Sequence, residues 1–64
     1  MTTEEIKDMD VNILLSIINL KLRDFYNNLD ELCYDLDINK DILIERLQKK
    51  NYKYDLSINQ FKSL

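Results

Sequence analysis

The sequence predicts a mainly α-helical fold: a three-helix, helix-turn-helix-like domain with a short C-terminal β-hairpin, the order of a reduced winged helix. Three segments repeat apolar residues with helical spacing, a four-residue corner from Leu36 to Asn39 separates the last two, and the pattern changes to period two after Lys50. The 64 residues include no glycine and no proline, which favours regular structure throughout. We therefore expect one domain over residues 10–62, preceded by a flexible polar leader over residues 1–9.

The first predicted helix is apolar on two sides. It begins after Asp10, which is a good N-cap, and runs about fourteen residues to Phe25. At about 100° per residue, the broader stripe, expected to face the core, contains Val11, Leu14, Leu15, Ile18, Leu22 and Phe25. The second stripe contains Ile13, Ile17 and Leu20, a candidate dimer seam. Such a stripe needs a cover, which is either the hairpin residues Tyr52, Tyr54 and Phe61, another subunit or a membrane surface.

A narrow polar line runs between those two stripes. It contains Asn12, Ser16, Asn19 and Arg23. Asparagine and serine are mediocre helix formers, so their alignment suggests that they hydrogen-bond to something. They either tie the helix to the hairpin or the C-terminal tail, or form a partner-binding surface with Arg23 as its charged anchor.

The helix-turn-helix corner is supported position by position. Cys33 supplies the small residue that lets the two helices approach, and Asp37 tolerates the positive φ that the corner often needs. Asn28 and Asn39 are suitable N-caps for the two helices. The remaining inward positions are apolar: Ile38, Leu43 and Leu47.

The hairpin follows a helix stop at Asn51, which accepts a left-handed conformation. Residues 52–55 alternate in polarity with period two, and residues 59–62 can return as the partner strand. We expect the turn near residues 56–58.

The chain from Asp10 to Phe61 resembles a bacterial family of small proteins known only as a domain of unknown function. Four runs carry the resemblance: Asp10-x-Asn12-x-Leu14-Leu15-Ser16, Asn19-x-Lys21-Leu22-Arg23-Asp24, Leu29-Asp30-Glu31-Leu32-Cys33, and Tyr52-x-Tyr54-Asp55 with Asn59-Gln60-Phe61. The family pattern usually has glycine and serine where this chain has Asn51 and Asn28, and both replacements keep the capping chemistry. The resemblance implies the architecture and no activity.

Charge opposes DNA binding, the first function that a helix-turn-helix suggests. Residues 1–38 carry three basic and nine acidic side chains, whereas residues 39–64 carry six basic and three acidic ones. The possible recognition-helix face is Lys40, Ile44 and Gln48. Asp41 and Glu45 lie on the same helix, and the whole chain has a net charge of -3, which leaves few cations for phosphates. We favour a protein partner; the alternative is a DNA-binding transcriptional regulator.

The inventory of residue types argues against an enzyme. The chain has no histidine for a general base or a usual zinc site, and no glycine for a phosphate-binding loop. The run Asp35-x-Asp37-x-Asn39 imitates a calcium loop but has Lys40 and Arg46 at the decisive positions. We expect no catalytic residue, metal, cofactor or small-molecule substrate.

Size and composition indicate the setting of the protein. A domain of 64 residues is marginal alone, and its single cysteine cannot form an internal disulfide, so a homodimer is expected. We interpret Cys33 as a core residue in a reducing compartment. No apolar run is long enough for a membrane span, and the N-terminus does not read as a signal peptide, which favours the cytoplasm.

Overall fold

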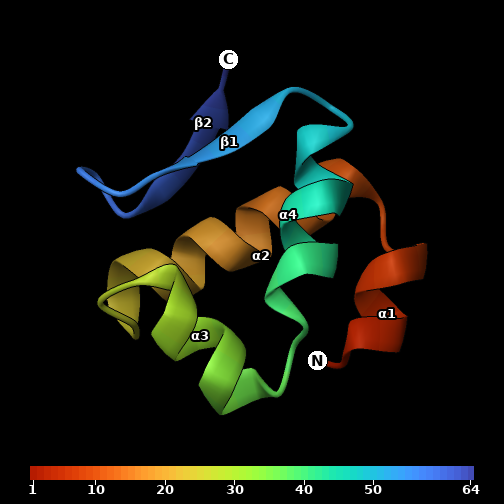
Figure 1. The fold of residues 1–64 in the computed structure, drawn as a ribbon, viewed down its shortest axis with the longest axis horizontal. Helices are drawn as coiled ribbons and strands as arrows, with labels where there is room; N and C mark the ends of the chain where they lie inside the picture. Colours follow the sequence, from red (N-terminus) through yellow and green to blue (C-terminus); the bar gives the residue numbers. More distant parts are fainter.

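Four helices and one β-hairpin make up the fold in the computed structural model, which describes all 64 residues (Figure 1). The elements are α1 Thr3–Asp8, α2 Val11–Asp24, α3 Leu29–Leu36, α4 Lys40–Gln48, β1 Tyr52–Asp55 and β2 Gln60–Ser63. The two strands are antiparallel, with Tyr52 opposite Ser63 and Asp55 opposite Gln60. The predicted fold class, mainly α with a C-terminal hairpin, is confirmed.

The corner between α3 and α4 has the predicted chemistry. Asp37 has φ 55°, in the left-handed region, and Asn39 accepts a hydrogen bond from the N–H of Ile42 at 3.1 Å. Ile38 and Cys33 are buried on the inner side. Burial also raises the pKa of the Cys33 thiol, so the thiolate is disfavoured.

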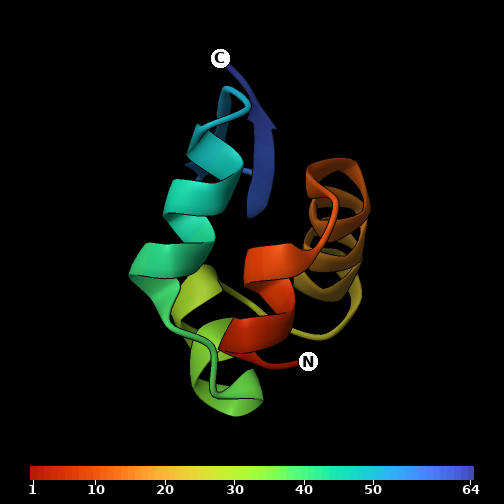
Figure 2. The same ribbon diagram turned by 90° about the vertical axis from the view of Figure 1, so that its right-hand side faces the viewer.

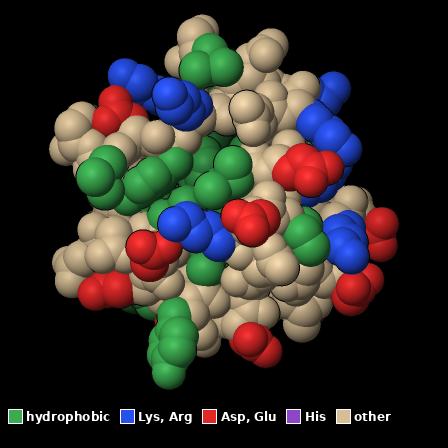
Figure 3. All heavy atoms as spheres, in the orientation of Figure 1, with side chains coloured by type: hydrophobic (Ala, Val, Ile, Leu, Met, Phe, Trp, Pro, Cys, Tyr) green, Lys and Arg blue, Asp and Glu red, His purple; other side chains and the backbone are tan.

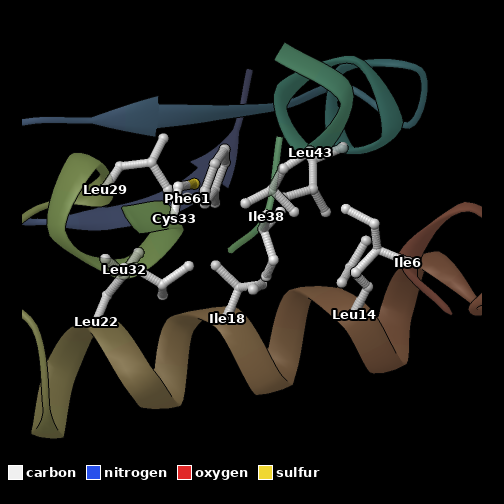
Figure 4. Close-up of a cluster of buried hydrophobic side chains, with 11 residues drawn as sticks. Ile6, Leu14, Ile18, Leu22, Leu29, Leu32, Cys33, Ile38, Leu43 and Phe61 are labelled. Atoms are coloured by element: carbon white, nitrogen blue, oxygen red, sulfur yellow. The ribbon is translucent and has the colours of Figure 1, made fainter. Parts of the chain in front are cut away.

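The core gathers one or more residues from every helix and from β2. Its members are Ile6, Leu14, Ile18, Leu22, Leu29, Leu32, Cys33, Ile38, Leu43, Leu47 and Phe61. Figure 4 shows α2 contributing Leu14, Ile18 and Leu22 along one side, as the broader stripe predicts. Phe61 reaches in from the hairpin beside Cys33, so the hairpin is part of the core.

Residues 1–9 differ from the flexible leader that the sequence predicts. Thr3–Asp8 form α1, and Ile6 is fully buried. The Arg46 guanidinium on α4 donates to the carbonyls of Ile6 at 3.2 Å and Met9 at 2.6 Å, which fastens the C-terminal end of α1 to α4. The prediction is wrong here because one buried isoleucine in a polar segment produces no periodic pattern.

Phe25 also departs from its predicted place in the core stripe. The helix ends at Asp24, and Phe25 takes cap angles of φ -126° and ψ -25°, with an exposed side chain. Tyr26 packs against the core instead, and its hydroxyl donates to Asp35 at 2.6 Å. The end of the helix therefore redirects the chain before the stripe is complete.

Candidate functional site

A groove of about 650 Å³ lies between the hairpin, the outer face of α4 and the start of α3. Six of its eleven lining residues are apolar: Leu29, Ile44, Tyr52, Tyr54, Leu56 and Leu64. The polar ones are Asn28, Asp30, Lys40, Gln48 and Lys53. Figure 3 shows this apolar patch between the hairpin and the two helices, with charged side chains on both sides of it. The groove is therefore an apolar surface with a charged rim.

The structure brings the three predicted recognition-helix residues, Lys40, Ile44 and Gln48, to this groove. The sequence did not predict the wall of the groove that the hairpin and the C-terminal residue form. Leu56 and Leu64 are 75% and 76% exposed. In the sequence, Leu56 belongs to the predicted turn of the hairpin and Leu64 to the tail after it, so neither belongs to a periodic pattern. Apolar residues outside any periodic pattern were the available signal.

Most basic side chains in the C-terminal half already have partners. Lys40 donates to Asp30 at 2.6 Å, and this hydrogen bond raises the pKa of Lys40. The other paired cations are Lys49 with Glu45, Lys62 with Asp55, and Arg46 with two backbone carbonyls. Only Lys50 and Lys53 of the six basic residues in this half have no ion pair and no carbonyl partner.

A hydrogen-bonded carboxylate holds the turn of the hairpin. The Asp55 side chain accepts from the hydroxyl and the N–H of Ser57 and from Lys62. These bonds, led by the Ser57 hydroxyl, lower the pKa of Asp55 to about 2. Asp55 is therefore charged at neutral pH and fully engaged within its own hairpin.

Asparagine and glutamine side chains fasten the other strand to α2. Asn19 accepts from the N–H of Phe61 at 2.8 Å and donates to its carbonyl at 3.0 Å. Asn59 donates to the carbonyls of Leu22 at 2.9 Å and Tyr26 at 3.0 Å, at the end of α2. Gln60 donates to the Asn19 carbonyl at 2.9 Å. The outer edge of β2 is thus closed by α2 at Phe61.

The predicted polar line does not act as one surface. Asn19 is half-buried and bonds to the backbone of Phe61, which fits the interpretation that the line ties the helix to the hairpin. Asn12 and Ser16 are exposed, and neither side chain makes a hydrogen bond; only the backbone N–H of Asn12 bonds to a side chain, the capping Asp10 carboxylate. Arg23 pairs with its neighbour Asp24 at 2.9 and 3.0 Å, which lowers the pKa of Asp24. Three of the four residues thus remain on the surface of α2.

The second apolar stripe of α2 is left uncovered. Ile13 and Leu20 are 56% and 47% exposed, and Ile17 is half-buried. The hairpin side chains expected as a cover, Tyr52, Tyr54 and Phe61, pack against the core on the other side of the helix. Figure 2 shows β2 on the side of α2 that also faces β1 and α4. Cover by the hairpin is therefore excluded as the explanation of this stripe.

Comparison with known proteins gives one match. A family model described as "Domain of unknown function (DUF4250)" matches residues 8–61. No curated protein and no solved structure matches the chain. The matched range agrees with the resemblance to a family of uncharacterised small proteins. In the structure itself, none of the helices combines the length and apolar character needed to cross a membrane.

Proposed function

Because this chain belongs to the DUF4250 family of domains of unknown function, we propose from its surface that it is a non-catalytic interaction module that binds another protein. The observation that carries this proposal is the groove, where Leu56 and Leu64 are exposed beside the half-buried Ile44. Exposed apolar patches with a polar rim are typical of protein contact sites. The buried Cys33 thiol supports a reducing, cytoplasmic setting for this contact.

DNA binding, the alternative for a helix-turn-helix, has less support. Affinity for DNA comes largely from cations that neutralise phosphates. On the possible recognition face, Lys40 is already paired with Asp30, while the acidic Asp41 and Glu45 are exposed on the same helix. A DNA phosphate would have to compete with Asp30 for Lys40 and with Glu45 for Lys49, and Asp41 would repel it.

Photo-cross-linking from the groove tests the proposal. A benzophenone amino acid at Gln48 is expected to join the module to a protein in native lysate, giving an adduct of defined mass. The same probe at Tyr34, which is 90% exposed and outside the groove, is expected to give none. Leu56→Glu should reduce the Gln48 adduct at least about tenfold, because it places a charge in an apolar contact worth more than about 1.4 kcal/mol. Tyr34→Glu is the matched control and should leave the yield unchanged.

A titration with short random-sequence duplex DNA at low salt separates the two functions. We expect no binding that depends steeply on salt. Binding that weakens sharply as salt is added, together with an equal adduct yield from Gln48 and Tyr34, would overturn the proposal in favour of DNA.

The same module is proposed to self-associate through the seam formed by Ile13, Ile17 and Leu20. A standard interface covers about 800 Å² per partner, roughly a fifth of the 4342 Å² that this chain exposes. The seam must therefore be the centre of a larger contact along α2. The exposure of Ile13 and Leu20, which no other part of the chain covers, supports this part of the proposal.

Ile17→Glu is expected to weaken the dimer at least about tenfold, because it buries a charge at the centre of the seam. Sedimentation equilibrium at micromolar concentration measures this. Ser16→Glu adds the same charge at the exposed neighbouring position and should have a smaller effect. A monomer at every concentration, or equal weakening by both variants, contradicts the seam.

A further inference from the structure

The hairpin has one open edge, on β1. Leu64 donates its N–H to the Asn51 carbonyl at 2.8 Å, which marks a hydrogen-bonded position of the ladder, while the Asn51 N–H donates to the Gln48 carbonyl at the end of α4. Such positions alternate along an antiparallel ladder, which makes Lys53 and Asp55 the next residues that bond to β2. Tyr52 and Tyr54 therefore turn their N–H and C=O groups away from β2. None of the hydrogen bonds that join different parts of the chain uses these backbone groups.

The groove lies along this open edge. Tyr52 and Tyr54 pack against the core on the inner face of the hairpin, and Lys53 points to the opposite face by alternation. All three residues line the groove, and a groove that touches both faces of a strand lies beside its edge. In Figure 1, β1 is in front of β2, and Figure 2 shows β2 between β1 and α2. The edge of β1 thus remains open at both tyrosines, whereas Asn19 closes the edge of β2 at Phe61.

We propose that the groove takes an extended segment of the protein partner, which adds as a third strand to the free edge of β1 and places an acidic residue opposite Lys53. This inference rests on the proposed function and specifies its ligand. Unpaired strand edges are templates for an added strand, and the main-chain bonds supply affinity while pockets for alternate side chains supply specificity. The residues on either side of the acidic one face inward, toward Ile44 and Leu29, and are apolar.

Lys53 argues against a second copy of this chain as the occupant. If the β1 edges of two copies paired as antiparallel strands, with Tyr52 of one copy bonded to Tyr54 of the other, Lys53 would lie opposite the Lys53 of the second copy. Like charges placed opposite each other are destabilising. Pairing centred on Tyr54 puts Lys53 opposite Asp55 instead. That carboxylate is already bound by Lys62 and Ser57, so it gives Lys53 little. A lysine in the middle of an edge is a common protection against self-pairing.

Two short capped peptides, one alternating valine with glutamate and one alternating valine with lysine, are the probes. At millimolar concentration the glutamate peptide is expected to slow amide hydrogen exchange at Tyr52 and Tyr54 at least about tenfold, as measured by NMR. The lysine peptide should bind at least about tenfold more weakly. Lys53→Glu should reverse this preference, whereas Lys21→Glu, on α2 and outside the groove, should leave it unchanged.

Chemical synthesis with an N-methyl group on the Tyr54 amide tests the main-chain contact itself. We expect an at least about tenfold loss of affinity for the glutamate peptide. N-methylation of Ser63, an amide on the edge of β2, should have no effect. Absence of protection by either peptide, or unchanged affinity after N-methylation of Tyr54, overturns strand addition while the cross-linking result from Gln48 still decides the proposed function. Self-association that this N-methyl group abolishes would assign the edge to a second copy and also overturn the inference.

Discussion

Replacement of Ile6 by alanine is expected to lower the free energy of unfolding by about 2–5 kcal/mol, the range for removing a buried isoleucine side chain. Ile6 is fully buried, and Figure 4 places it next to Leu14 of α2 and close to Leu43 of α4. A domain of this size has only about 3–10 kcal/mol of stability in total. Chemical denaturation followed by circular dichroism should therefore show a variant that is partly unfolded in water.

Lys7→Ala on the same helix is the matched control. Its ammonium is exposed and makes one surface ion pair with Glu4 at 3.5 Å, so the expected change is below about 0.5 kcal/mol. Equal denaturation midpoints for Ile6→Ala and Lys7→Ala would mean that α1 does not pack on the core in solution.

The features that the sequence predicted well have local causes. The corner depends on Asp37, which accepts positive φ, and on Asn39, which caps the helix that begins next to it. Asn51 likewise takes φ 65° in the turn between the end of α4 at Gln48 and the start of β1. Each of these residues decides the backbone within a few positions of itself, so its chemistry can be read from the neighbouring sequence.

The features that the sequence did not reveal depend on contacts between distant segments. Ile6 is buried because α1 packs on the core, and Arg46, forty positions later, bonds to the Ile6 carbonyl and helps to hold α1 there. The groove likewise exists only after the hairpin packs beside α4, which brings Leu56 and Leu64 near Ile44. Helical periodicity indicates which face of one helix is apolar. It does not indicate whether a hairpin that packs beside this helix will leave a groove between them.

Asn19 is the clearest example, and Asn19→Ala is expected to destabilise the domain by about 2–4 kcal/mol. The substitution removes both hydrogen bonds to the backbone of Phe61, 42 positions away. Phe61 is buried, so its N–H and C=O would lose their partners where water has little access, and each such group costs about 1–3 kcal/mol. Thermal and chemical denaturation measure the loss. The detached hairpin should also weaken cross-linking from Gln48, since it forms one wall of the groove.

The other members of the polar line provide the controls for Asn19. Asn12→Ala and Ser16→Ala change exposed side chains without hydrogen bonds, so both should be neutral or stabilising by about 0.5 kcal/mol through the better helix propensity of alanine. Asn19→Asp keeps an acceptor for the Phe61 N–H but turns a second oxygen toward the Phe61 carbonyl, so it should not restore stability. A normally stable Asn19→Ala variant that loses only partner binding would contradict the structural role of Asn19, because that result requires a side chain that meets the partner directly.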